Sequence, residues 1–387
     1  MAETLAPGGS SRTMQAIAVV PGKANSIHLR NDARRPAVAD FPEGRGVLVE
    51  VIRVGVDGTD REIAYAEFGE APEGDDHLII GHESLGRIVE AGSDVPAWAT
   101  PGSLVVATVR RPGSSIYDAI GFPDFTTDDV VYERGIRRLH GFLAEWYAED
   151  VTFLVPIPES LEPVAVLMEP LSVVEKGIRQ AFEIQRRLHV WEPRRAAVLG
   201  AGSIGMLAAL ALRLRGLDVA VYSRREPPYL NSELLARIGA RYVGSGQTTL
   251  EQLAEQHGPF DLALEATGFS PLAIEAGTIL ARNGVLILTG VTGGDHRADI
   301  PTDRLNQGFV LGNKVMVGTV NAARDDFVTG VADMLRAEAT YPGWLGRLLT
   351  TPIKGLAGYQ EMLDRLEHDE EAIKVFVEVA RYRRSGA

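Results

Sequence analysis

The sequence predicts an α/β protein of two domains, the first rich in short strands and the second built around a parallel sheet. Residues 14–110 alternate short apolar runs with Gly, Pro and Asp turns, a spacing typical of a barrel-like β domain. From about residue 195 to 320, runs of strand length alternate with amphipathic stretches of helical length, which indicates βαβ units. The 387 residues, 45% of them hydrophobic, suffice for two cores.

Composition excludes several classes of function. The chain contains no cysteine, which excludes disulfides, thiolate zinc sites and cysteine nucleophiles. Its net charge of −13 argues against nucleic acid as a main partner, because phosphate binding needs a basic face. No apolar run approaches the roughly 18 residues that span a bilayer, and the N-terminus lacks the pattern of a secretory signal. We therefore expect a cytoplasmic protein that binds neither nucleic acid nor membrane.

The first domain is expected to span residues 14–190 and to be completed by residues 322–387. Residues 1–13 are rich in small and polar residues and predict a flexible tail. Residues 111–141 lack periodicity and predict an irregular, loop-rich segment. The predicted strands are short and apolar, at 15–20, 47–54, 86–92 and 375–379.

The second domain, expected at 191–321, opens with a glycine-rich turn between an apolar strand at 196–199 and a helix at 206–215. In this turn Gly200 allows the tight bend, Gly202 lets the backbone approach a pyrophosphate, and Gly205 permits close packing of helix on strand. The helix N-terminus adds free N–H groups and a partial positive charge. This context predicts a Rossmann, doubly wound parallel sheet with a dinucleotide at the turn. The predicted cofactor-binding residues there are Gly200, Gly202, Ser203, Ile204 and Gly205.

The end of the next strand, 219–222, indicates which dinucleotide binds. NAD-selective sites usually place a carboxylate there to hold the ribose 2′-hydroxyl. This chain has Ser223, Arg224 and Arg225 instead, so two guanidiniums are available for a 2′-phosphate. A solvated loop, or a Glu226 that turns inward, are the alternatives. The sequence favours NADP and leaves NAD open.

Two later strands end in small polar residues. Thr267 follows the strand at 262–265, and Thr289 follows the strand at 285–288. Ligands of open α/β sheets bind at the carboxyl ends of strands, so we expect both threonines to border the nicotinamide ribose. Either threonine also fits an ordinary turn.

Several coordinating side chains predict a metal site. His82 and Glu83 follow an apolar run, Asp57 lies upstream, and Glu169 stands inside the apolar run 167–171. A histidine beside a glutamate is more often structural, but a carboxylate among apolar residues needs a partner such as a metal. One nitrogen with two or three carboxylate oxygens suits a catalytic zinc site that keeps an open position.

These features follow one another in a fixed order: a β domain, a Gly-His-Glu segment, a carboxylate in an apolar run, and a dinucleotide turn. In this order the sequence resembles the zinc-dependent medium-chain dehydrogenases, and most closely their glucose 1-dehydrogenase branch. The resemblance runs from Met14 over nearly the whole chain. It implies a GroES-like β-barrel catalytic domain beside the Rossmann domain, NADP as cofactor, and one catalytic zinc per chain at Asp57, His82, Glu83 and Glu169. The matching segments are 57–63, 81–83, 141–145, 169–176, 223–226 and 318–321.

The resemblance also implies an activity, the oxidation of the anomeric carbon of D-glucose or another aldose to a lactone with hydride transfer to NADP. It places Thr59 and Glu169 at the substrate and Glu62 in a proton relay, although Thr59 to Glu62 also fits a helix capping box. Glu133 would lie near the zinc and sugar, and Asn321 near the nicotinamide and substrate. A solvated loop charge and a turn residue are the alternatives for these two.

The chain departs from the family pattern at three places. Asp57 stands where most relatives have cysteine, and oxygen-rich sites also accept manganese or magnesium, although His82 favours zinc. Residues 113–126 lack the four cysteines that hold a structural zinc in many relatives. We therefore expect no structural zinc, and a homo-oligomer, dimer or tetramer, with the dimer favoured. Val173 replaces an aspartate that contacts sugar in some relatives, which leaves the choice of aldose open.

Two other functions remain compatible with the sequence. One is a zinc-dependent polyol or secondary-alcohol dehydrogenase, which would differ in its substrate pocket. The other is a non-catalytic NADPH-binding sensor, which predicts that the metal ligands are lost while the glycine turn survives; the coordinating groups at all four ligand positions argue against it.

Overall fold

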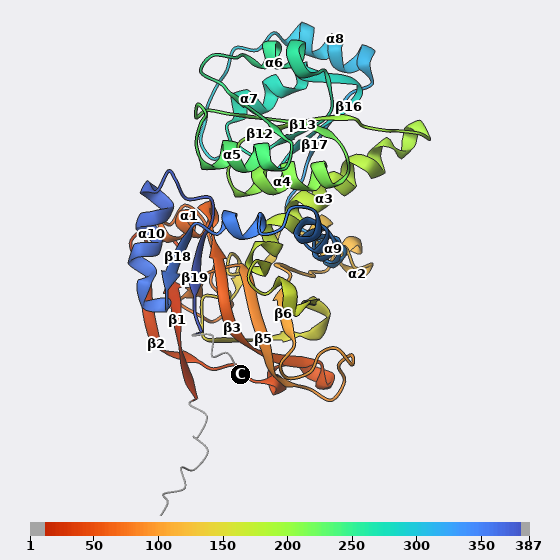
Figure 1. Cartoon of the computed structure of the whole chain (residues 1–387). Coiled ribbons are helices and arrows are strands. Elements are labelled where there is room, and N and C mark those ends of the chain that lie inside the picture. The colour runs from red at the N-terminus through yellow and green to blue at the C-terminus, as the bar shows by residue number, and fades with distance from the viewer. Residues whose placement is uncertain (1–11, 381–387) are drawn as a thin grey trace, which may run out of the picture. The chain divides into compact units, whose positions relative to one another are not determined.

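The computed structural model describes residues 12–380 and divides into two compact units (Figure 1). The first comprises the described residues up to Gly113, Asp128–Glu162, and the described residues from Thr351 onward; the second comprises Ser114–Thr127 and Pro163–Thr350. The predicted flexible tail falls outside the described residues except at its end, where Thr13 already begins a strand.

The first unit is a β structure centred on strand β3 (Gly46–Val56). In its larger sheet, β3 pairs antiparallel with β5 (Glu83–Ala91), β10 (Trp146–Asp150) and β19 (Val375–Glu378). Nine of the eleven β3 residues are buried, so this strand runs through the core of the unit. The pairing of β19 with β3 brings the C-terminal segment beside the strand that precedes Asp57.

The remaining elements of the first unit are short. Helix α1 follows β3 directly, and α10 packs on β18 and β19. The bounds are β1 Thr13–Val19, β2 His28–Arg34, α1 Gly58–Ala64, β4 Leu78–Ile79, β6 Leu104–Ala107, β7 Arg110–Arg111, β8 Tyr132–Arg134, β9 Arg138–Leu139, β11 Leu154–Ile157, β18 Thr351–Lys354 and α10 Tyr359–His368.

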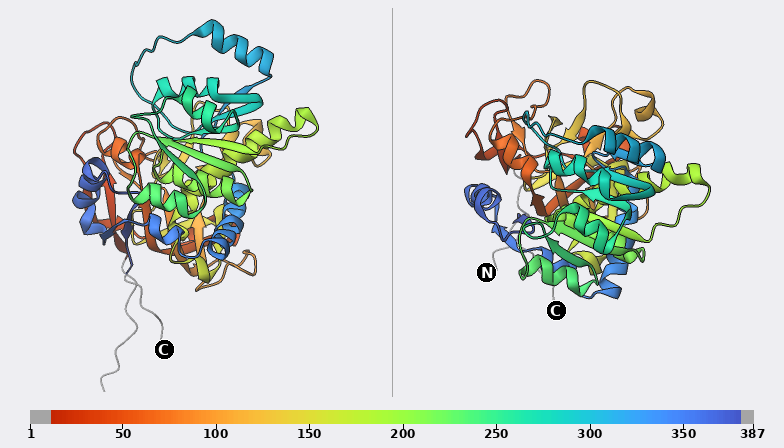
Figure 2. Two further views of the ribbon diagram at one scale, coloured as in Figure 1. Left: turned by 45° about the horizontal axis from the view of Figure 1, so that its top comes forward. Right: turned by 90° about the horizontal axis from the view of Figure 1, so that it is seen from above.

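The second unit contains a six-stranded parallel sheet in the order β14-β13-β12-β15-β16-β17. The strand order reverses between β12 and β15, which confirms the predicted Rossmann topology. Figure 2 shows helix α8 and the loop before it at the periphery of this unit. The bounds are α2 Ile116–Ala119, α3 Met168–Gln185, β12 Arg195–Leu199, α4 Ser203–Leu214, β13 Asp218–Ser223, α5 Leu230–Arg237, β14 Arg241–Gly244, α6 Leu250–His257, β15 Phe260–Glu265, α7 Ser270–Glu275, β16 Leu280–Leu288, α8 Thr302–Gly312, β17 Val315–Gly318 and α9 Arg324–Thr340.

The compact units divide the chain differently from the predicted domains. Residues 163–190 and 322–350, expected in the first domain, lie in the second unit because α3 packs against β16, α4 and α9. Helix α3 begins at Met168, and Pro170, its third residue, is tolerated because it lies in the first helical turn. The segment 111–141, expected to be irregular, contains α2, a 3-10 helix at Pro123–Phe125 and short strands.

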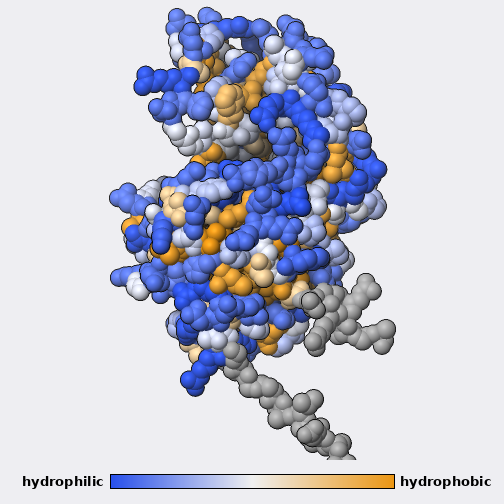
Figure 3. Space-filling model, turned by 90° about the vertical axis from the view of Figure 1, so that its left-hand side faces the viewer, coloured by the Kyte–Doolittle hydropathy of each residue, from blue (hydrophilic) through white to orange (hydrophobic). Residues whose placement is uncertain are grey.

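The surface is mixed in character. Hydrophilic side chains cover most of the face shown in Figure 3, with smaller groups of apolar side chains between them. Within residues 12–380, no helix combines the length and apolar character needed to cross a membrane.

Candidate active site and cofactor site

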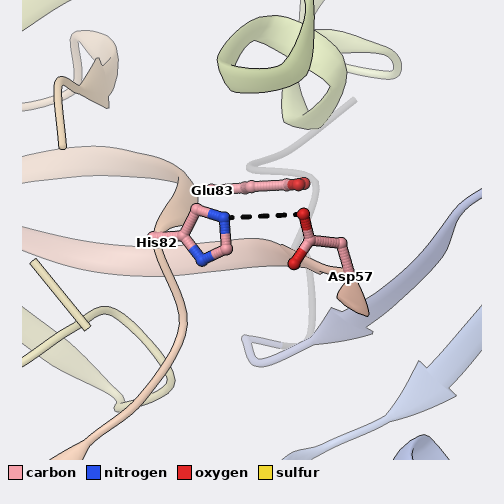
Figure 4. Close-up of side chains that lie close together, drawn as sticks. All are labelled: Asp57, His82 and Glu83. Atoms are coloured by element: carbon pink, nitrogen blue, oxygen red, sulfur yellow. Dashed lines mark ion pairs between the residues drawn. The ribbon is translucent and has the colours of Figure 1, made fainter. Parts of the chain in front are cut away.

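The first unit brings three of the predicted metal ligands together. Asp57 follows β3 and caps α1, where its Oδ1 accepts the N–H of Thr59 at 2.8 Å. Its other oxygen, Oδ2, lies 3.8 Å from Nε2 of His82 (Figure 4). Glu83, the first residue of β5, completes the group, and one ligand atom from each residue lies within 4.8 Å of the others.

Glu83 is the most deeply buried member, with 1% of its surface exposed. Its Oε1 lies 2.5 Å from Nζ of Lys374, which is equally buried, and Oε2 has no hydrogen-bond partner among residues 12–380. Burial raises the pKa of Glu83, and the positive charge of Lys374 opposes that rise. A buried carboxylate oxygen without a partner is costly, which fits a cation at this position.

Strand pairing explains why Glu83 and Lys374 meet. Gly55 of β3 pairs with Glu83 on one side and with Phe376 of β19 on the other. A Cβ atom on Gly55 would lie 1.9 Å from Oε2 of Glu83 and 2.8 Å from Cε of Lys374. The glycine therefore makes the room in which the buried ion pair sits.

Asp60, fully buried, holds the group in place. Its Oδ1 accepts the N–H of Gly81 at 3.0 Å, its Oδ2 accepts the N–H of Asp57 at 3.2 Å, and Oδ2 lies 3.7 Å from Nδ1 of His82. A metal-ligating histidine usually has a carboxylate near its far nitrogen, and Asp60 is the carboxylate on that side of His82, at an ion-pair distance that is longer than a hydrogen bond. Sequence reasoning did not single out Asp60 or Lys374. For Asp60, the available signal was an acidic residue three positions after a helix-capping aspartate.

The capping box at α1 therefore involves Asp57 and Asp60, and the alternative that paired Thr59 with Glu62 is wrong in register. Thr59 is half-buried as the second residue of the helix. Glu62 keeps 36% of its side chain exposed and lies 3.8 Å from Arg61. Its role in a relay stays a prediction.

The donor set fits a divalent cation. It offers one imidazole nitrogen and two carboxylates, in a place where Glu83 and His82 are buried. That combination is typical of zinc, and its share of oxygen ligands also suits manganese or magnesium. The structure therefore supports a metal site at Asp57, His82 and Glu83.

Glu133 occupies a buried position on β8, with 7% of its surface exposed. Its Oε1 accepts a hydrogen bond from the guanidinium of Arg110, itself buried, at 2.9 Å. The alternative of a solvated loop charge is therefore wrong, and a role near zinc and sugar stays a prediction.

Two other predicted residues belong to the second unit. Glu169 is the second residue of α3 and is half-buried, although its neighbours Met168 and Pro170 are buried. Asn321 follows β17 with a φ of 58°, a left-handed conformation that asparagine tolerates in turns. This conformation agrees with the turn alternative, while the substrate and cofactor roles of both residues stay predictions.

The segment 113–126, which lacks the family cysteines, is held by hydrogen bonds and an ion pair. Ser115 and Thr126 each donate a hydroxyl hydrogen bond of 2.6 Å to Oδ2 of Asp118. The buried Lys176 on α3 lies 2.8 Å from Asp124 and donates to the carbonyl oxygen of Val320 at 2.7 Å. These contacts hold the segment to α3 within the second unit.

The glycine turn has the geometry that its sequence predicts. Gly200 has a φ of 104°, in the region that glycine favours. A Cβ on Gly205 would lie 2.1 Å from the carbonyl oxygen of Gly200, so helix α4 and the turn are in close contact. A Cβ on Gly202 would meet nothing within 4 Å. The open space at Gly202, beside the N-terminus of α4, suits a phosphate group.

The residues after β13 lie where a ribose-recognition group is expected. Arg224 and Arg225 are exposed, and Ser223 is half-buried at the end of the strand. The carboxylate of Glu226 accepts the N–H of Gly246 at 2.8 Å, so it is fixed on the loop after β14.

The two threonines at later strand ends bond to Glu265, the buried last residue of β15. The hydroxyl of Thr267 donates to the carboxylate of Glu265, and the hydroxyl of Thr289 donates to its carbonyl oxygen at 2.6 Å. Both hydroxyls therefore stabilise their own turns. Contact with the nicotinamide ribose stays a prediction.

Comparison with known proteins agrees with this architecture. Residues 43–159 match the alcohol dehydrogenase GroES-like domain, and residues 162–379 match the glucose dehydrogenase C-terminus. The glucose 1-dehydrogenase of Methanocella arvoryzae is 42% identical over 369 residues, which cover 95% of this chain and 99% of the relative. Glucose 1-dehydrogenase 1 of Haloterrigena turkmenica is 36% identical over 377 residues, covering 94% and 99%.

A solved structure shows the same fold. Haloferax mediterranei glucose dehydrogenase, in complex with NADP, Zn and gluconolactone, superimposes with a TM-score of 0.84 at 32% identity and covers 95% of this chain and 100% of its own. The two domain matches, the full-length relatives and this superposition agree with the resemblance seen in the sequence. The chain therefore belongs to the zinc-dependent medium-chain dehydrogenase family, in its glucose dehydrogenase branch.

Proposed function

We propose that the chain is a glucose 1-dehydrogenase that oxidises C1 of D-glucose to gluconolactone and transfers the hydride to NADP. The observation that carries this proposal is the cluster of Asp57, His82 and Glu83, whose ligand atoms lie within 4.8 Å of one another. Bound zinc would supply Lewis acidity toward the substrate hydroxyl, and bound NADP would accept the hydride. The intact ligand set argues against a non-catalytic NADPH-binding sensor.

The chain's own residues would hold the metal and move the proton. Asp60 lies 3.7 Å from Nδ1 of His82, and Lys374 donates to Oε1 of Glu83. Glu62 would receive the substrate proton by way of Thr59. Burial, together with the negative charge of Glu67, raises the pKa of Glu62, which makes it a stronger base than an ordinary glutamate.

Other parts of the proposal rest on the family resemblance. Glu169 would complete the metal site and contact substrate, and Glu133 and Asn321 would also contact the sugar. Thr267, Thr289 and Asn321 would border the nicotinamide ribose. We propose one zinc per chain, no structural zinc, a homo-oligomer and a cytoplasmic location.

The metal assignment is tested by His82→Ala, with His368→Ala as the matched control because 67% of the His368 side chain is exposed in the same unit. His82→Ala should lose zinc, measured by mass spectrometry, and aldose oxidation, measured by NADPH absorbance, but retain NADPH binding. The control should keep all three. A His82→Ala protein that keeps its zinc and its activity would refute the ligand assignment.

The substrate is tested with a panel of glucose, galactose, xylose, polyols and secondary alcohols, each with NADP and with NAD. Oxidation of an aldose in preference to the alcohols supports the proposal. A wild-type protein that binds NADPH but holds no zinc and oxidises no aldose would overturn it.

The cofactor is tested by Arg224→Ala combined with Arg225→Ala. Loss of both guanidiniums should raise the KM for NADP far more than the KM for NAD, since only NADP carries the 2′-phosphate. Equal increases in both values would contradict the assignment of these arginines.

A further inference from the structure

Two tyrosines that the sequence did not single out lie against the Ser223–Arg225 segment. Tyr229 immediately precedes α5, and Tyr242 lies on β14. Their rings meet edge to face with centroids 5.4 Å apart, and the hydroxyl of Tyr229 donates to that of Tyr242 at 2.9 Å. The two residues, which we call the tyrosine pair, therefore contact each other through both their rings and their hydroxyls.

The tyrosine pair contacts both the backbone and the side chain of Arg225. The hydroxyl of Tyr242 donates to the carbonyl oxygen of Arg225 at 2.5 Å. The guanidinium carbon of Arg225 lies 4.4 Å from the centre of the Tyr229 ring. Backbone and side chain of the same arginine are thus held by two neighbouring aromatic residues.

Stacking on an aromatic ring engages the flat face of a guanidinium. The contact with Tyr229 uses the flat face of the group, whereas its N–H donors point outward in the plane. Those donors match the oxygens of a phosphate in a bidentate arrangement. Holding a long side chain in place beforehand also reduces the entropy lost when the ligand binds.

The acidic neighbour of Arg225 is held elsewhere. The carboxylate of Glu226 accepts the N–H of Gly246, and a Cβ on Gly244 would lie 2.3 Å from one of its oxygens. Glycines at 244 and 246 thus make room for this carboxylate on the loop after β14. Its negative charge is partly balanced there by a backbone donor.

We propose that Tyr229 and Tyr242 are positioning residues that set the preference for NADP by holding Arg225 ready for the cofactor 2′-phosphate. The inference rests on the proposed use of NADP and extends it to residues that do not themselves bind the phosphate. It predicts an effect confined to ligands that carry a 2′-phosphate.

The test compares binding of 2′,5′-ADP and of 5′-AMP to the full-length protein by calorimetry. Tyr229→Leu removes the aromatic face and should weaken 2′,5′-ADP binding about tenfold while changing 5′-AMP binding less than twofold. Tyr229→Phe keeps the face and should lose less than Tyr229→Leu. Tyr242→Phe keeps the ring but removes the bond to the Arg225 carbonyl, together with the hydrogen bond that the Tyr242 hydroxyl accepts from Tyr229, and should weaken 2′,5′-ADP binding about threefold.

Tyr341→Phe is the matched control, because the Tyr341 hydroxyl also donates to a backbone carbonyl in this unit, that of Ile238 at 3.4 Å. It should leave the ratio of the two affinities unchanged. Steady-state kinetics should show the same split, with KM for NADP raised and KM for NAD unchanged in the Tyr229 and Tyr242 variants. Tyr229→Phe and Tyr242→Phe are conservative changes, so the test remains decisive if Tyr229→Leu fails to fold.

Two results would overturn the inference. If the variants weaken both nucleotides equally, the tyrosine pair is merely structural, while NADP-dependent aldose oxidation stands. If the wild-type protein does not distinguish 2′,5′-ADP from 5′-AMP, the inference fails together with the proposed use of NADP. Turnover of aldose with NAD would then show whether the dehydrogenase activity itself survives.

Discussion

The buried ion pair beside the candidate metal site can be tested by Lys374→Met. Methionine keeps most of the length of the lysine side chain and removes its charge. In the wild-type protein the Lys374 ammonium lies 2.5 Å from Glu83, and each side chain is 1% exposed. The variant would leave the Glu83 carboxylate buried without this cation.

Removing one partner of a buried pair costs about 3–5 kcal/mol, because the remaining charge stays in a poorly polarisable interior. The free energy of unfolding of the metal-free variant should fall by that amount. At about 2–4 °C per kcal/mol for a domain of 150–250 residues, the melting temperature should fall by roughly 10 °C. Zinc should reduce the loss, since a bound cation would neutralise the same carboxylate.

The assay is urea unfolding followed by circular dichroism, with EDTA and again with zinc. Lys354→Met is the matched control in the same unit, because the side chain of Lys354 is 77% exposed in its ion pair with Glu378. Exposed pairs contribute about 0–1 kcal/mol, so the control should be nearly as stable as wild type. If Lys374→Met in EDTA costs no more than the control, the assignment of a strongly coupled buried pair is refuted.

The glycine turn and a buried carboxylate of α3 give two further predictions. Gly205→Ala should destabilise the protein by about 2 kcal/mol or more, because its Cβ would lie 2.1 Å from the Gly200 carbonyl oxygen. Gly202→Ala should keep the melting temperature of wild type but weaken NADPH binding at least about tenfold. The reverse pattern in thermal melts and fluorescence titrations would contradict this division of roles. Burial, opposed by Arg215, raises the pKa of Glu175 to about 8, so stability from the bound proton is complete below pH 4.5 and is lost as the pH rises through 8. Between pH 4.5 and 8, the unfolding free energy of wild type should fall more steeply than that of Glu175→Gln, and the two slopes should differ by roughly 1.4 kcal/mol per pH unit. Equal slopes in urea titrations at a series of pH values would contradict the raised pKa of Glu175.

The parts of the protein that could be predicted from the sequence depend on residues close together in the chain. The turn at Gly200–Gly205 lies between its own strand and helix, so the periodic pattern and the glycine spacing identify it without tertiary information. The arginines after β13 were predictable for the same reason. The pairing of His82 with Glu83 is local as well, which is why these side chains could be proposed as ligands.

The start of helix α3 and the boundaries of the two compact units were harder to predict from the sequence. Helix α3 begins at Met168 because its apolar first turn is buried in the second unit, and the proline within that turn masks the helical pattern. Helices α3 and α9 belong to the unit of the parallel sheet because α3 packs on β16 and α9 packs on α3 and α4, and no local pattern in the sequence shows these contacts.

By itself, the sequence determined the fold class, the dinucleotide turn, the types of metal-ligating side chains and the family. Only the tertiary structure decided which groups hold those residues in place. Lys374 is 291 positions away from Glu83, and they meet because β5 and β19 flank the same strand, β3. The physical reason is that an ion pair or an aromatic contact depends on distance in space, whereas a sequence pattern records only separation along the chain.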